Sequence, residues 1–122
     1  MAKDDYDVII YKILVYLYAC LKRKILFEKT TFDAAVKKDV ENDVYFAEIL
    51  KMMQEEGLIE GLTFADMWGG DVVLANEIKD AKITAKGIHY LEENALMAKV
   101  GEKLKNSVDT IAKLAALVGL FA

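Results

Sequence analysis

The stretch from Phe46 to Leu91 constrains the fold most, because a complete run of elements can be predicted along it. Apolar residues recur at helical spacing up to Gly57, and glycine commonly follows the last turn of a helix. An apolar run from Leu58 to Phe64 predicts a strand, and Val72 to Ala75 supplies a returning antiparallel one that Ile78 to Lys82 is expected to extend irregularly. Thr84 is placed to cap a further helix. The predicted order is therefore helix, two-stranded hairpin, helix.

Three helices are predicted ahead of the hairpin. The first is expected to be capped by Asp4 or Asp5 and to run to about Lys22, which places positive charge at its C-terminal end. Thr30 or Thr31 is expected to cap the second, and Asn42 or Asp43 to cap the third. Two short helices joined by a few polar residues have the proportions of a helix-turn-helix.

These elements predict an α+β, mainly helical fold, namely a winged helix-turn-helix with additional C-terminal helical structure. We expect residues 4–94 to form the winged-helix domain. Residues 95–122 are expected to form a C-terminal helical extension that packs on the first helix. A chain of 122 residues is long enough to bury one core of this kind.

Two blocks of the chain resemble a known family. Ile49–Gly61 and, more specifically, Ile83–Asn94 are similar to the YjcQ-like family of small winged-helix proteins from bacteria and their phages. The resemblance covers about residues 5 to 105. It implies a winged-helix fold, a cytoplasmic setting and a prophage origin, and it implies no activity.

The residue types needed for catalysis are too few to form a site. The chain has one histidine, His89, one cysteine, Cys20, and one serine, Ser107. A metal site of nitrogen and sulfur ligands needs several such groups, and nucleophilic catalysis needs a neighbouring base. We therefore expect neither an enzyme nor a cofactor or metal. Cys20 lies in an apolar run and is predicted to pack as a small hydrophobe in a reducing, cytoplasmic protein.

DNA binding is the leading interpretation of the predicted fold, as a phage- or prophage-type regulatory protein. Contacts would come from the second and third helices and the hairpin, and the candidates are Lys37, Lys38, Tyr45, Lys51 and Gln54. The charge counts against it. The chain carries a formal net charge of −4, and its third helix holds more glutamates than lysines.

A protein–protein interaction module without DNA binding is the alternative interpretation. Met67 and Trp68 occupy the hairpin turn, and both residue types are enriched at protein interfaces. The competing interpretation is that Trp68 folds back onto the core of its own hairpin. An acidic third helix and a Trp-bearing turn would together meet a basic or apolar partner.

The last expectation concerns assembly. The first helix has a second apolar stripe, which needs a cover that the C-terminal helix can supply, either in the same chain or from a second copy. The interpretation favoured from the sequence is a homodimer. The C-terminal segment lacks the broad basic face of a membrane-surface helix, so no membrane partner is expected. The residues expected at this contact are Tyr11, Val15, Tyr18, Ile111, Leu114 and Val118.

Overall fold

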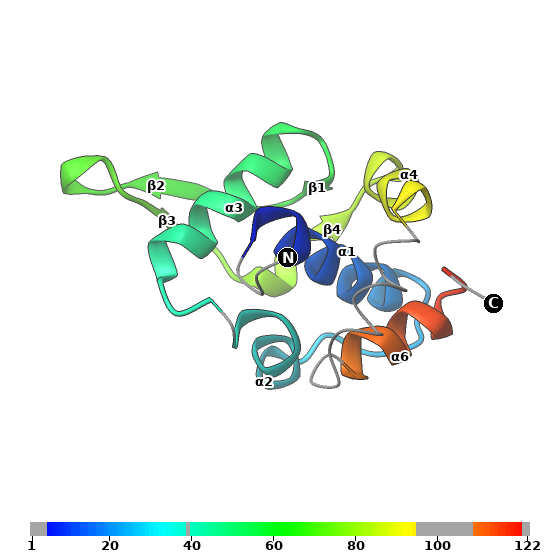
Figure 1. Ribbon diagram of the computed structural model, residues 1–122. Coiled ribbons are helices and arrows are strands. Elements are labelled where there is room, and N and C mark those ends of the chain that lie inside the picture. The colour runs from blue at the N-terminus through cyan, green and yellow to red at the C-terminus, as the bar shows by residue number, and fades with distance from the viewer. Residues whose placement is uncertain (1–4, 39, 95–108, 121–122) are drawn as a thin grey trace.

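The computed structural model describes residues 5–38, 40–94 and 109–120, and its arrangement of elements is shown in Figure 1. Helix α1 (Tyr6–Leu21) is central, because it packs against α3, α4, α6 and strand β4. Each residue from Ile9 to Leu17 is buried. Apart from the buried Lys12 this stretch is apolar on all sides, so it must be covered all round, and the surrounding elements provide that cover.

The second and third helices follow a short extended connection. Helix α2 (Lys29–Phe32) continues directly into a π-helical segment, η1 (Asp33–Lys37). The prediction that Thr30 or Thr31 caps this helix is wrong. The helix begins earlier, after Glu28, and the Thr31 hydroxyl donates to the Glu28 carboxylate at 3.0 Å.

Helix α3 (Asp43–Glu55) has the ends that its sequence predicts. The Asn42 side chain accepts a hydrogen bond from the Tyr45 backbone N–H at 3.0 Å, which satisfies one of the free donors of the first turn. After the last turn Gly57 takes a φ of +80°, a conformation that glycine adopts without strain.

Two separate antiparallel sheets make up the β part. Strand β1 (Ile59–Glu60) pairs with β4 (Lys82–Ile83), and β2 (Phe64–Asp66) pairs with β3 (Val72–Leu74). Two short 3₁₀ turns, η2 (Trp68–Gly70) and η3 (Ile78–Asp80), lie at the hairpin tip and between β3 and β4.

The prediction of one continuous strand from Leu58 to Phe64 is wrong. So is the irregular extension of the returning strand from Ile78 to Lys82, because that segment forms the turn η3 and the start of β4, which pairs with β1. The chain turns at Gly61, whose φ is +98° and whose position lies directly against the Asp80 carbonyl. The amide of Gln54 then holds both backbone groups of Leu62. These two constraints direct β1 and β2 to different partner strands.

Two further helices complete the described fold. Helix α4 (Ala85–Glu93) is capped by Thr84, whose hydroxyl accepts from the Gly87 N–H at 3.1 Å, as predicted. Helix α6 (Asp109–Leu117) lies beside α1 (Figure 1), and the Lys22 ammonium donates to the Val118 carbonyl at 2.8 Å. The predicted domain boundary at residue 95 falls outside the described residues.

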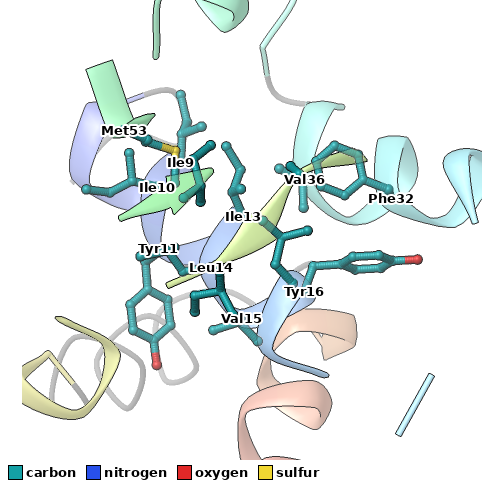
Figure 2. Packing of buried hydrophobic residues seen from close by; sticks show 14 of the residues in the cluster. Ile9, Ile10, Tyr11, Ile13, Leu14, Val15, Tyr16, Phe32, Val36 and Met53 are labelled. Atoms are coloured by element: carbon teal, nitrogen blue, oxygen red, sulfur yellow. The ribbon is translucent and has the colours of Figure 1, made fainter. Parts of the chain in front are cut away.

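The core is built around the two sides of α1. Figure 2 shows Tyr16 pointing toward Phe32 while Tyr11 points away from it. The rings of Tyr16, Phe27 and Phe32 pack with centroids 5.2–5.5 Å apart, and Phe46 joins them at 6.3 Å from Phe32. The fold is α+β and mainly helical, as predicted, while its assignment to the winged-helix class stays a prediction.

Candidate interaction surface

We treat the exposed side of α3 and the β2–β3 hairpin, which packs against α3 through β3, as one candidate surface. We call the hairpin the wing, and the two together the α3–wing surface. The exposed or half-exposed side chains that define this surface are Tyr45, Glu48, Lys51, Met52, Glu55, Asp66, Met67, Trp68 and Asp71.

The structure does not gather the predicted DNA contacts into one patch. Lys37 is held in an ion pair with Asp43 at 2.6 Å, and its hydrogen bond lowers the pKa of that carboxyl group. Lys38 is exposed on the preceding turn and Tyr45 on the first turn of α3. Gln54 lies nine positions further along α3 than Tyr45, which is about 13 Å along the axis.

Gln54 has a structural task that the sequence does not suggest. Its Oε1 accepts from the Leu62 N–H at 2.9 Å, and its Nε2 donates to the Leu62 carbonyl at 2.8 Å. Both hydrogen bonds replace strand pairing at the point where the chain leaves β1. The side chain is therefore committed to the fold, and Lys51 is left half-buried as the basic residue of α3.

The α3–wing surface is acidic. On α3 this surface carries Glu48 and Glu55 against Lys51. The wing adds Asp66 and Asp71 and has no basic residue between β2 and β3. Four acidic side chains against one basic one give this surface the same sign of charge as a phosphate backbone.

The wing tip is apolar and fully exposed. Trp68 is 99% exposed and Met67 is 52% exposed, so Trp68 does not fold back onto the core of the wing. The tip is closed by a hydrogen bond from the Met67 N–H to the Asp71 carbonyl at 2.7 Å. In Figure 1 the wing projects away from the body of the molecule. Tryptophan is among the residue types most enriched at the centres of protein interfaces. A tryptophan side chain that is fully exposed to water at the end of a hairpin is therefore unusual.

A groove of about 500 Å³ lies between α2, the start of α3 and the β3–η3 segment. Its floor is apolar and its rim is charged, and one wall is the π-helical segment η1. The sequence did not predict this groove, because it forms only where residues 27–50 meet residues 73–79 in the folded chain. Its lining residues are Phe27, Lys29, Phe32, Asp33, Lys37, Asp43, Val44, Phe46, Ala47, Leu50, Val73, Leu74, Asn76, Glu77, Ile78 and Lys79.

The residues predicted at a dimer or cap contact lie along α1 and α6. Tyr11 and Val15 are buried, and Tyr18 is half-buried with the Lys22 ammonium 4.9 Å from its ring centroid. The α6 residues Ile111, Leu114 and Val118 are buried as well, in the same chain. This face therefore needs no second copy to cover it, and the homodimer itself stays a proposal.

Other site types find little support in the described part of the chain. Across residues 5–38, 40–94 and 109–120, no helix is long and apolar enough to cross a membrane. The same residues contain no cluster of three or more histidine, cysteine or acidic side chains placed to hold a metal ion. Cys20 is half-buried, and burial raises the pKa of its thiol, which suits a packed side chain better than a nucleophile.

Comparison with known proteins gives one match. No curated protein and no solved structure is significantly similar to this chain. The family model described as YjcQ protein matches residues 11–110, which include most of α1, both sheets, α4 and the start of α6. Because this match spans most of the 122 residues, the chain belongs to the YjcQ protein family.

Proposed function

We propose that this YjcQ-family protein is a small protein-interaction module that works in the cytoplasm. The α3–wing surface meets a partner protein whose own surface is basic with apolar positions. The observation that carries the proposal is the composition of this surface, in which acidic side chains surround exposed Tyr45, Met52, Met67 and Trp68.

The charge of α3 argues against DNA as the main ligand. In helix-turn-helix proteins the second helix of the motif enters the major groove, which would bring Glu48 and Glu55 close to phosphates. Affinity for DNA comes largely from lysines and arginines that displace counterions, and α3 offers only half-buried Lys51. The energetic term that dominates DNA binding is therefore missing from this helix.

The apolar residues favour a protein ligand. Tyrosine, tryptophan and methionine are enriched in the centres of protein interfaces, while acidic residues favour the rim. Here Met52 lies between Glu48 and Glu55 on the exposed side of α3, and Trp68 lies between Asp66 and Asp71 on the wing. Both elements thus repeat one arrangement, an apolar centre with an acidic border. A partner with lysines around an apolar centre would complement it.

DNA-binding regulation remains the second candidate, because the order of elements from α2 to the wing is the order expected of a winged helix. Lys37 and Lys38 precede α3 and would be the basic contacts. A prophage origin, as the family resemblance implies, would suit either candidate.

Binding of labelled random duplex DNA across a salt series separates the two candidates. We expect no binding at low salt, because α3 repels the backbone. The matched variant carries Glu48→Lys and Glu55→Lys on the exposed side of α3, and we expect it to gain salt-sensitive binding. Tight binding by the unmodified protein, with affinity that falls steeply as salt increases, would overturn the interaction module.

A positive test uses a lysine-rich amphipathic helical peptide, followed by backbone amide NMR shifts. We expect shifts in α3 around Glu48, Met52 and Glu55 and in the wing. A peptide in which every lysine is replaced by glutamate is the control and should cause no shifts. Equal shifts with both peptides, or shifts confined to residues outside the α3–wing surface, would contradict the proposal.

A further inference from the structure

We propose that the wing tip inserts into the groove of a second copy of this chain, and that two copies do so reciprocally. This rests on the proposed function and names one occupant for the wing part of the α3–wing surface. The two observations behind it are the fully exposed Trp68 and the open apolar groove of about 500 Å³ in the same molecule.

The position of the groove allows two copies to insert their wing tips reciprocally and so form a closed dimer. Val73 and Leu74 of β3 line the groove, so the base of each wing forms a wall of the site that would receive the other tip. When two wings lie antiparallel, each tip reaches the base of its neighbour, and both insertions span the same length of hairpin. A two-fold arrangement therefore satisfies both sites and leaves no open end for further growth.

The groove matches an uncharged aromatic side chain. Its lining includes the half-buried side chains of Phe27, Val73 and Leu74, which offer apolar surface for packing an indole, and the rings of Phe32 and Phe46 lie buried behind them. Its volume lies within the range of about 300–1,000 Å³ typical of ligand sites, so it holds an indole and a neighbouring side chain. The π-helical wall adds to this, because π-helical turns are rare and often occur at functional sites.

The charges around the groove and beside the wing tip are also compatible with insertion of the tip. The rim charges pair with one another as Lys29–Asp33, Lys37–Asp43 and Lys79–Glu77, so the groove presents no uncompensated charge to an apolar tip. Asp66 and Asp71 flank the tip. They would come to lie near the rim, where Lys29 and Lys79, whose side chains are 72% and 62% exposed, can pair with them in place of Asp33 and Glu77, and these two rim carboxylates would then be solvated by water.

The contact is expected to be weak and reversible. A buried tryptophan contributes about 150–250 Å² of surface, and two of them fall well below the roughly 1,200–2,000 Å² of a stable interface. The adjoining wing residues add further area but not a large core. We therefore expect dimers to form at micromolar to millimolar concentrations, and a partner protein to be able to displace them.

The test exploits Trp68 as the sole tryptophan of the chain. On dilution from about millimolar to micromolar protein, its fluorescence emission should shift to longer wavelength as the indole returns to water. The mass from sedimentation should fall from twice 13.7 kDa to 13.7 kDa over the same range. A constant mass of 13.7 kDa with unchanging emission would overturn the proposal.

Two variants separate the insertion from any other dimer. Trp68→Ala removes the tip but leaves the groove, whereas Val73→Arg obstructs the groove but leaves the tip. Each alone should stay monomeric, while Leu26→Ala, at an exposed leucine outside the groove, should dimerise as the parent does. If Val73→Arg disturbs the circular dichroism spectrum, Lys79→Glu at the rim replaces it and should weaken the dimer.

Mixing the two variants gives the decisive measurement. Trp68→Ala protein titrated into Val73→Arg protein should shift the emission to shorter wavelength, because the one remaining indole enters the one intact groove. A tip-to-tip dimer would show no such shift, and neither would a groove filled by a foreign partner, so its absence overturns the inference. The peptide and DNA experiments on α3 do not depend on this result, so failure of the dimer leaves the interaction module standing.

Discussion

At the scale of single residues, two tyrosines of α1 differ in how their hydroxyl groups are satisfied. The Tyr16 hydroxyl exchanges hydrogen bonds with the backbone of Glu28, as donor to its carbonyl and acceptor from its N–H, both at 3.3 Å. The Tyr11 hydroxyl is buried and has no hydrogen-bond partner among residues 5–38, 40–94 and 109–120. A buried unsatisfied donor costs about 1–3 kcal/mol, whereas a satisfied one contributes roughly 0.5–1.5 kcal/mol.

Phenylalanine substitutions should therefore have opposite effects on stability. We expect Tyr11→Phe to leave the free energy of unfolding unchanged or to raise it, and Tyr16→Phe to lower it by about 1 kcal/mol. Urea unfolding followed by circular dichroism measures both variants against the parent. If Tyr11→Phe lowers the free energy of unfolding by more than about 1 kcal/mol, the Tyr11 hydroxyl makes a stabilising hydrogen bond and the prediction is wrong.

Tyr90 should make stability depend on pH at the alkaline end. Burial raises the pKa of Tyr90 to about 12, and the nearby charges of Asp7 and Tyr6 add to the increase. The folded state thus favours the neutral phenol, so this contribution is complete below the ordinary pKa of about 10 and is lost as the pH rises toward 12. Tyr90→Phe should reduce the loss of unfolding free energy between about pH 10 and pH 12. An unchanged pH profile would contradict this.

At the scale of elements, the packing of α4 on β1 and β4 depends on Gly87. A Cβ atom at this position would overlap the Leu58 carbonyl oxygen and lie 2.7 Å from Cγ1 of Ile83. Alanine normally stabilises a helix by about 1 kcal/mol relative to glycine, but here the overlap involves backbone that cannot move away cheaply. Because of this close approach, we expect alanine at position 87 to lower the stability of the protein rather than raise it.

We expect Gly87→Ala to lower the free energy of unfolding by roughly 1–3 kcal/mol, as overpacked sites do. The matched control is Ala85→Gly in the exposed first turn of the same helix, which should cost no more than about 1 kcal/mol. Thermal unfolding of both variants compares them directly. A more stable Gly87→Ala protein would mean that α4 does not pack this closely.

At the scale of the whole molecule, α6 completes the cover of α1. Ile111, Leu114, Ala115 and Val118 are all buried at this contact, while Leu117 on the same helix is 51% exposed. Burying each large aliphatic side chain is worth about 1.5–3 kcal/mol, so the helix contributes a large share of the 5–15 kcal/mol typical of a domain.

The paired substitutions Leu114→Asp and Leu117→Asp test this cover within one helix. Leu114→Asp should lower the melting temperature strongly and expose apolar surface to a hydrophobic dye, because it places a charge against α1. Leu117→Asp should leave both measurements close to the parent. Similar melting temperatures for the two variants would indicate that α6 does not cover α1 in solution.

Local signals in the sequence were enough for several features of this protein. The cap at Thr84 and the glycine ending at Gly57 were predicted correctly, and Asn42 is one of the two residues predicted to cap α3, because each of these depends on contacts within one turn of helix. The α+β class followed from these ends and from the apolar spacing between them. The family followed from the Ile83–Asn94 block, and the match over residues 11–110 agrees with it.

Only the tertiary structure decided which strands pair, what Gln54 does and where the groove lies. The apolar run from Leu58 to Phe64 reads as one strand because nothing within it shows that Asp80 and Gln54 will constrain the chain at Gly61 and Leu62. The exposure of Trp68 was equally open, since a turn residue can face its own hairpin or the solvent. Which strands pair and which side chains are buried depend on contacts between segments that are distant in sequence. Short-range sequence patterns carry no information about these contacts.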